Sequence, residues 1–382
     1  MLTLRPGSLA YRLISMLSVT GEYPIHSLHL LGNPRVMRDL VRRMSEPQLI
    51  RLPGADSVQT KLVQISGKGA AKSVRLYRGA LPILEWMHPD AFDYYMASFW
   101  SHRFPGDAAH RDRNHRVAEA TALCAQSEIE IVPYLLPALQ MESIQHTVSE
   151  RPSLYLARDL KKINASEQNK TMFTRTVGAL FYPGGCYAIY NTRSSIMKWS
   201  GMGEFKSRLS LQEIARLNAG IETVDSAVLM GESEMTAMDT LLESERTHRP
   251  EFRFDSIYQH VHFVPLNEFG ASLLRLLTIQ NWNNRLMDLL FDADVRSYGR
   301  GTLEYDAYID GKYVLSHLDG DLARLIRFRE AIRIQNGVFE VLCFPEQMQL
   351  LREYLPPEVN LKVISLNAVL DQFLRERRDA RE

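Results

Sequence analysis

Two histidines, His260 and His262, lie one residue apart in a run that predicts a strand over residues 260–265. Side chains alternate along a strand, so both imidazoles face the same side, which suits two ligands of one metal ion. A metal ion there could stabilise negative charge on an oxygen atom while a nucleophilic side chain attacks the substrate. Tyr258, Tyr298, Tyr305 and Tyr308 are the candidate nucleophiles. Since no third ligand is evident, a half-exposed strand with hydrogen-bonded histidines is the competing interpretation.

Carboxylates gather further along the chain. Glu304 and Asp306 lie in one strand of a predicted hairpin, and the next strand ends at His317, Asp319 and Asp321. Asp306 with Asp319 could hold a weak metal site, because carboxylate oxygens are ligands for divalent ions. A strand-edge acid and a helix cap are the alternative.

A stripe of arginines offers a different chemistry, the binding of phosphates and base edges. Asn33 is a good N-cap with Pro34 at the first helical position, which predicts a helix to about Met44. Arg35, Arg38 and Arg42 follow at spacings of three and four and therefore share one face. The inward face is expected to be Val36, Leu40, Val41 and Met44.

The elements around this helix predict a winged helix-turn-helix over residues 1–80. Helices over 8–18 and 25–31 precede it, and a hairpin of 62–66 and 73–77 with a glycine-rich, basic link follows. A helix can enter the major groove while the hairpin touches the flanking backbone. A protein-docking module with solvated arginines is the alternative. The expected DNA contacts are Arg35, Arg38, Arg42, Arg43, Lys68, Lys72 and Arg75.

Charge is distributed unevenly along the 382 residues, although the net charge is zero. Residues 1–80 hold twelve Lys and Arg against four Asp and Glu, a net charge of +8. Such a basic module on an acidic body is typical of proteins that bind polyanions.

Composition narrows the class of protein. The chain is 45% hydrophobic and 24% charged, which favours a globular protein over a disordered one. No apolar stretch is long enough for a membrane helix, and three scattered cysteines make a disulfide framework improbable, so a cytoplasmic protein is expected. Neither a P-loop nor a Gly-x-Ser-x-Gly elbow is present, and no cofactor is predicted.

Beyond residue 80 the pattern predicts an aromatic helical linker and then an α/β body. We expect the linker over 81–107, with a boundary at 104–107, and two similar halves over 108–266 and 267–382. The first half should contain a helix over 109–126, strands over 128–133, 174–182 and 186–191, a helix over 203–218, a strand over 226–230, a helix over 233–245 and a strand over 260–265. The second should contain helical sequence over 267–290, strands over 303–309 and 312–317, a helix over 320–332, a strand over 338–343, a helix over 345–354, a strand over 360–365 and a last helix.

Two segments resemble the replication-relaxation proteins of bacterial plasmids and conjugative elements. The run Val74 to Gly79 with Leu84 is similar to that family's strand, leucine, glycine and helix sequence. The run His110 to Val117 looks like the histidine-led helix that opens the family's second domain. The resemblance implies DNA binding in plasmid replication or transfer, and a body related to the restriction-endonuclease fold.

Nucleases of that fold place an aspartate on one hairpin strand and an acid and a lysine, two residues apart, on the next. The carboxylates hold Mg²⁺ and the lysine positions water. The strands over 176–180 and 187–191 carry no carboxylate, and Glu204 with Lys206 falls in the following helix. The second half has Glu304 and Asp306 but no such lysine, so we expect this catalysis to be lost.

These observations predict a sequence-specific double-stranded DNA-binding protein of a mobile genetic element. It would act in plasmid replication, relaxosome assembly or conjugative transfer, with protein partners of such a complex and no membrane. One alternative is a metal-dependent nickase, relaxase or nuclease using His260 and His262 or Asp306 and Asp319, since a histidine-hydrophobe-histidine strand is similar to the metal site of relaxases. Another is a protein-binding scaffold or transcriptional regulator. A homodimer and a monomer both remain open.

Overall fold

The chain is a mixed α/β protein with two compact units. The computed structural model describes residues 1–99, 108–134, 143–163, 173, 175–196, 199, 202–247, 253–297 and 303–379. The first unit comprises Met1–Gln126 with Glu130–Pro137, and the second comprises Ser127–Ile129 with Ala138–Glu382. Both units contain helices and strands.

Local capping explains the first helices of the first unit. Helix α1 (Leu9–Thr20) begins where the Ser8 hydroxyl accepts a hydrogen bond from the Tyr11 amide, and it ends at Gly21, whose φ is 75°. The expected second helix is a 3-10 helix, η1 (Ile25–Leu31). Helix α2 (Pro34–Met44) starts at the predicted Asn33 cap. The three predicted helical segments are therefore confirmed, the second with tighter geometry.

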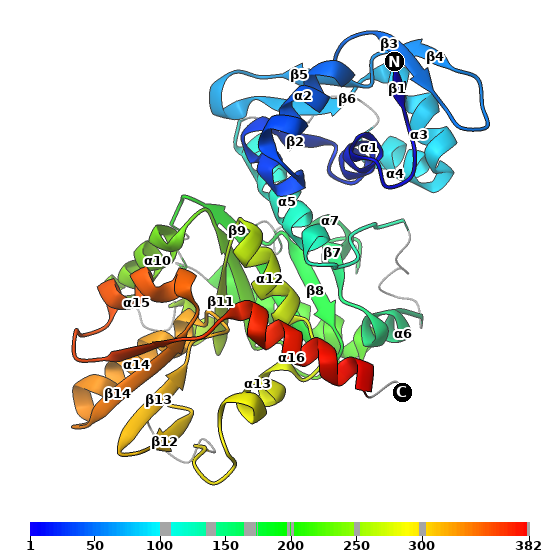
Figure 1. Cartoon of the computed structure of the whole chain (residues 1–382). Coiled ribbons are helices and arrows are strands. Elements are labelled where there is room, and N and C mark those ends of the chain that lie inside the picture. Colours follow the sequence, from blue (N-terminus) through cyan, green and yellow to red (C-terminus); the bar gives the residue numbers. More distant parts are fainter. Residues whose placement is uncertain are drawn as a thin grey trace. The chain divides into compact units, whose positions relative to one another are not determined.

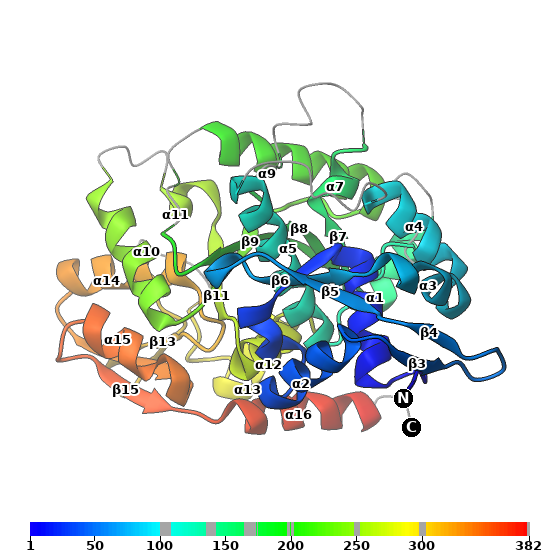
Figure 2. The same ribbon diagram turned by 90° about the horizontal axis from the view of Figure 1, so that it is seen from above.

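Two small sheets complete the N-terminal part of this unit. One has the order β2-β6-β5, all antiparallel, and the other has the order β1-β3-β4. The bounds are β1 Leu2–Thr3, β2 Glu22–Pro24, β3 Gln48–Arg51, β4 Val58–Thr60, β5 Val63–Ser66 and β6 Ser73–Leu76. The hairpins β5-β6 and β3-β4 extend to opposite sides of the unit (Figures 1 and 2).

The link between β5 and β6 depends on a glycine. Gly67 has a φ of 80°, and a Cβ atom there would lie 2.2 Å from the Ala71 carbonyl oxygen. The link can therefore turn only because residue 67 lacks a side chain. Its tip holds a short 3-10 turn, η2 (Gly69–Ala71), which the sequence did not indicate.

The segment expected to be a linker packs within the first unit. Residues 81–99 form two helices, α3 (Leu81–Met87) and α4 (Pro89–Phe99), because extended His88 precedes a proline. A short turn, η3 (Arg78–Ala80), leads into them, and α4 packs against α1. The expected boundary at 104–107 lies outside the described residues.

Helix α5 (Ala108–Gln126) confirms the helix predicted over 109–126, but it belongs to the first unit, where it packs against β2, η1 and α1. The strand predicted over 128–133 is wrong. Glu128 has a φ of 62°, which turns the chain out of an extended conformation. The division into units therefore follows α5 and not the aromatic segment.

The second unit contains a mixed sheet with the order β11-β10-β9-β8-β7. Strands β7, β8 and β9 are antiparallel neighbours, whereas β9, β10 and β11 run parallel. The strand bounds are β7 Ser153–Leu156, β8 Gly178–Tyr182, β9 Gly185–Arg193, β10 Ser226–Gly231 and β11 His260–Pro265. The helices are α6 Ser143–Glu150, α7 Ala157–Leu160, α9 Met202–Ile214 with the π turn η4 Ala215–Ala219, α10 Glu234–Arg246, α11 Phe254–Ile257 and α12 Glu268–Leu277.

A second sheet of this unit has the order β12-β13-β14-β15. Its strands are β12 Ala307–Ile309, β13 Lys312–Ser316, β14 Val338–Cys343 and β15 Asn360–Val363. Its helices are α13 Trp282–Leu290, α14 Leu322–Ile334, the 3-10 turn η6 Pro345–Gln347, α15 Met348–Tyr354 and α16 Leu366–Asp379. In Figure 1 the first sheet is green and the second is orange.

The order of elements expected to recur does recur. In each half an antiparallel hairpin is followed by a helix, a parallel strand, a helix and a second parallel strand. Strand β7 is an addition to the first half that the sequence did not indicate. None of the helices in the described ranges has both the length and the apolarity needed to cross a membrane.

Glu234, in the first turn of α10, makes stability depend on pH. Burial and the nearby Glu346 raise the pKa of its carboxyl from 4.5 to about 7. Between pH 4.5 and about pH 7 this carboxyl ionises in the unfolded chain but stays protonated in the folded chain. Its contribution to the free energy of unfolding is therefore lost as pH rises through this range.

We expect Glu234→Gln to stabilise the protein by about 1–2 kcal/mol at high pH, after allowance for solvent screening, and to have almost no effect below the ordinary carboxyl pKa. Urea unfolding at about pH 8 and about pH 4.5 measures this. Exposed Glu232 provides the control, because Glu232→Gln should have the same small effect at both values. An equal effect of Glu234→Gln at both pH values would contradict the assignment.

Candidate functional site

Helix α2 presents its arginines to solvent. Met37, Val41 and Met44 are buried at spacings of four and three, and Arg35, Arg38, Arg42 and Arg43 are all exposed. The expected inward face is confirmed at Val41 and Met44, whereas Leu40 is half-buried and Val36 is 48% exposed, with Met37 buried in its place. The arginine face is nevertheless on the side that the sequence predicted.

The start of the helix is fixed by its cap, whereas its arginines are only weakly held. The Asn33 side-chain oxygen accepts hydrogen bonds from the amides of Arg35 and Val36. Arg42 lies 3.5 Å from Asp39, but both side chains are more than half exposed, and such surface pairs contribute little. Within the described residues Arg35, Arg38 and Arg43 form no ion pair. The guanidinium groups are therefore available to a polyanion.

The β5-β6 hairpin carries two further exposed cations, Lys68 and Lys72. It is attached to the helical part, because the Ile25 amide donates to the Lys72 carbonyl over 2.9 Å and the Leu62 amide to the Met44 carbonyl over 2.8 Å. The end of α2 is thus joined by a hydrogen bond to the start of the hairpin, although β3 and β4 lie between them in the sequence.

Arg75 is placed differently from the other expected DNA contacts. It lies half-buried on β6, the central strand, opposite Glu22 of β2 and Gln64 of β5. Burial raises the pKa of Tyr95 to about 12, and the nearby charge of Arg75 opposes that rise. Arg75 therefore interacts with the interior side of the sheet and not with the hairpin tip.

Buried polar contacts hold α5 against the rest of the first unit, and they were not predicted from the sequence. Nε2 of His115 lies 2.6 Å from a carboxylate oxygen of Glu22, and the Ser27 hydroxyl donates to Glu119 over 2.5 Å. All four side chains are at most 4% exposed. His115 and Glu119 are one helical turn apart, which is the only sequence signal for a shared inward face.

A second candidate site is a cavity of about 710 Å³ in the second unit. Strand β11 contributes His260 and His262, helix α13 contributes Trp282, and the second half contributes Asp319 and Arg324. Glu304, Tyr305 and Asp306 also line it. The histidines and carboxylates singled out from the sequence, which lie about 60 residues apart in the chain, therefore line one space.

The turn after β13 brings these groups together. The Phe263 amide donates to the Gly320 carbonyl over 2.9 Å, and His262 and Asp321 form an antiparallel bridge. Asp321 is the N-cap of α14, accepting hydrogen bonds from the amides of Ala323 and Arg324. The helix cap expected at Asp319 is therefore wrong by two residues: Asp321 is the cap, and it also contacts β11.

His260 and Asp321 form a close pair, with Nδ1 of the ring 2.7 Å from a carboxylate oxygen. Burial would lower the pKa of His260, but the hydrogen bond and charge of Asp321 outweigh it and raise that pKa. Burial likewise opposes ionisation of Asp321, yet the His260 hydrogen bond and nearby positive charge hold its pKa well below the ordinary value. The pair is therefore ionic.

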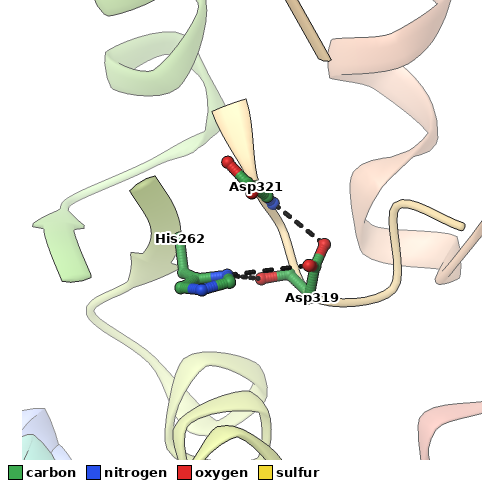
Figure 3. A group of neighbouring side chains, drawn as sticks. All are labelled: His262, Asp319 and Asp321. Carbon is green, nitrogen blue, oxygen red and sulfur yellow. Dashed lines mark hydrogen bonds and ion pairs between the residues drawn. The ribbon is translucent and has the colours of Figure 1, made fainter. Parts of the chain in front are cut away.

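His262 is held by Asp319 and by aromatic rings. Its Nδ1 donates to the Asp319 carbonyl over 3.0 Å and lies 3.8 Å from the Asp319 carboxylate. Tyr187 and Trp282 pack edge-on against the ring. Figure 3 shows these contacts of His262 with Asp319, and the hydrogen bond that the Asp321 amide donates to the Asp319 carboxylate. Burial raises the pKa of Asp319, and the nearby charges of His262 and Arg324 oppose that rise.

Asp306 belongs to a different network from Asp319. Arg324 lies 2.6 Å from Asp306 and 2.7 Å from Glu304, and Arg327 also contacts Glu304. The Ser316 amide donates to Asp306 over 2.7 Å, so this acid fixes the edge of a strand. The Asp306–Asp319 pair considered from the sequence is not brought together as one ligand set.

Of the remaining candidate residues from the sequence, all that the structure describes except Tyr305 lie outside the cavity lining. Tyr258 is 1% exposed and hydrogen-bonded to Tyr190, Tyr298 lies outside the described residues, and Tyr308 is exposed on β12. Glu204 is buried on α9 and paired with Arg175. Among the described tyrosines considered from the sequence, Tyr305 is the one that lines the cavity.

Comparisons with protein-family models, with curated proteins and with solved structures found no match. The resemblance to replication-relaxation proteins therefore stays a prediction.

Arg324 neutralises two largely buried carboxylates, so its removal should be costly. We expect Arg324→Met to lower the free energy of unfolding by about 3 kcal/mol or more, because Asp306 is left without its cation. Urea unfolding measures this.

Lys312→Met is the matched control, since Lys312 is 41% exposed and pairs with Glu340 across 3.3 Å. This pair should contribute less than about 1 kcal/mol. Similar losses in the two variants would show that the Arg324 network does not stabilise the second half.

Proposed function

We propose that the protein binds double-stranded DNA through its first unit, with α2 in the major groove. The observation that carries the proposal is the exposure of Arg35, Arg38, Arg42 and Arg43 on a helix whose opposite side is buried. Arginine can contact guanine edges in pairs of hydrogen bonds and can also bind phosphates.

The order of elements around α2 supports this function. Helix α1, strand β2, helices η1 and α2, and the hairpin β5-β6 follow one another, and β2, β6 and β5 form one sheet. This is the order of a winged helix-turn-helix, in which the last helix reads bases and the hairpin touches the backbone. The insertion of β3 and β4 between α2 and β5 is a departure from the simplest form.

The charge of the module fits a nucleic-acid partner better than a protein partner. The net charge of +8 over residues 1–80 raises the local concentration of a polyanion. We assign base and phosphate contacts to the four α2 arginines and backbone contacts to Lys68 and Lys72. Arg75, half-buried beside Tyr95, has a supporting role in the sheet.

For the second unit we propose a non-catalytic body that contacts partners in plasmid replication, relaxosome assembly or conjugative transfer. The recurring order of strands supports an internal duplication. Strands β8 and β9, which form the hairpin of the first half, carry no carboxylate, so the nuclease-like arrangement lacks the acids that hold Mg²⁺. Three buried cysteines, Cys124, Cys186 and Cys343, suit a reducing cytoplasm.

A relaxase or nickase is less well supported. Such an enzyme needs a tyrosine that can reach a phosphate beside the metal. Tyr258, the candidate nearest His260 in sequence, is buried and hydrogen-bonded to Tyr190. Tyr305 lines the cavity with His260 and His262, and it is the described tyrosine on which this alternative depends.

Loss of two α2 arginines should weaken DNA binding sharply. We expect Arg38→Ala/Arg42→Ala to lower the affinity of the full chain for duplex DNA by about 10-fold or more, with a flatter salt dependence, because two cationic contacts are lost. A gel-shift titration at several salt concentrations measures both.

The control is Arg333→Ala/Arg352→Ala, which removes two exposed arginines from α14 and α15 of the second unit. It changes net charge equally and should leave the affinity almost unchanged. Unchanged affinity in the α2 variant would overturn the proposal.

The hairpin lysines should contribute affinity without sequence preference. We expect Lys68→Ala/Lys72→Ala to weaken binding to all duplexes by a similar factor and to reduce the salt slope by about 1–2, since each phosphate contact adds about 0.9. Fluorescence anisotropy with several unrelated duplexes measures this.

Arg5→Ala/Arg51→Ala is the matched variant, because both arginines are exposed in the first unit but outside the β5-β6 hairpin. A loss as large as that of the lysine variant would mean that overall charge, and not the hairpin, determines binding.

A further inference from the structure

We propose that His262, Asp319 and Asp321 form a binding site for one divalent transition-metal ion, Mn²⁺ or Zn²⁺. The site lies in the second unit and goes beyond the DNA binding proposed for the first, on which it does not depend.

The three side chains have the right separation for a common ion. Each offers one ligand atom, and these atoms lie within 4.8 Å of one another. Ligands of one ion with bonds of about 2.0–2.2 Å lie at most about 4.4 Å apart. Movements of the side chains of His262, Asp319 and Asp321 toward one another would therefore bring their ligand atoms into bonding range.

Burial and charge favour a bound cation. His262, Asp319 and Asp321 are 2%, 5% and 0% exposed, and two buried carboxylates so close together need compensation. Asp321 has His260 at 2.7 Å. For Asp319 the one basic group within ion-pair distance among the described residues is His262, at 3.8 Å. A divalent ion would supply the charge that Asp319 lacks.

The surroundings add space and a further nitrogen. The cavity of about 710 Å³ is lined by His262 and Asp319, so an ion has a route and room for water ligands. His317 is 1% exposed, its Nδ1 has no hydrogen-bond partner within the described residues, and its ring interacts electrostatically with Asp321 and His262. This buried, unpartnered nitrogen therefore belongs to a residue within electrostatic range of two of the proposed ligands.

Neighbouring groups fix the ligands in place. The Tyr187 hydroxyl accepts a hydrogen bond from the Trp282 indole over 2.9 Å, and both rings pack edge-on against His262. His260 donates to Asp321 and orients its carboxylate. Metal sites commonly use such supporting contacts to hold ligand orientation.

The donor set selects the class of ion. One imidazole nitrogen with two carboxylate oxygens suits Mn²⁺ or Zn²⁺, whereas Ca²⁺ and Mg²⁺ prefer oxygen ligands alone. We therefore expect a clear preference for the first two ions.

Calorimetric titration of the tag-free full chain, after removal of metals by a chelator, tests the site. MnCl₂ or ZnCl₂ should bind with one ion per chain, and MgCl₂ or CaCl₂ at least about 10-fold more weakly. Electron spin-echo spectroscopy of the Mn²⁺ complex should show coupling to one histidine nitrogen.

Two variants and a control decide the assignment. His262→Phe should abolish the nitrogen coupling, and Asp319→Asn, which keeps an acceptor for the Asp321 amide, should weaken binding at least about 10-fold. Asp288→Asn is the matched control, because Asp288 lines the same cavity but is 68% exposed and paired with Arg296.

Failure to bind Mn²⁺ or Zn²⁺, or binding that Asp319→Asn leaves unchanged, would overturn the proposal. If His262→Phe does not fold by circular dichroism, Asp319→Asn and the nitrogen coupling of the unmodified chain remain decisive. DNA affinity should be measured on the same samples. Absence of metal binding with DNA binding intact would overturn the metal site alone, whereas absence of DNA binding would overturn the proposed function.

Discussion

The proposed function depends on the apolar seam of α2. Met37, Val41 and Met44 can be buried together only if the helix turns its other side outward, and that side holds the arginines. The Asn33 cap and Pro34 fix where the helix begins, and hence which residues face inward. The Leu62 amide donates to the carbonyl of Met44, so the buried end of α2 also anchors the start of the hairpin that carries Lys68 and Lys72.

In the second unit, Asp321 has the corresponding role. One carboxylate caps α14, accepts the Val261 amide of β11 and pairs with His260, so it joins the end of the first half to the start of a helix in the second. Its burial is tolerated because these donors satisfy both oxygens. Asp319, two residues earlier, lies beside His262 as a consequence. Burial raises the pKa of its carboxyl, and among the described residues His262 is the one basic group within ion-pair distance.

Local sequence signals predicted most elements, because caps, glycine turns and apolar periodicity act over a few residues. Asn33-Pro34 located α2, and Asp310-Gly311 located the turn between β12 and β13. Signals failed where packing or backbone geometry decided the outcome. Val36 and Met37 are both apolar, and only the position of the core selects Met37. His262 and Asp319 are 57 residues apart in the chain, so no local sequence pattern could predict that they are in contact.

The measurement that tests the central claim most directly is a fluorescence anisotropy titration of the full chain with a random-sequence duplex at about 50 and 200 mM salt. If the four arginines of α2 and the two hairpin lysines contact phosphates, affinity should fall about 1,000-fold between these concentrations, as counterion release requires. Absence of binding at the lower concentration, or binding that does not change with salt, would contradict the account.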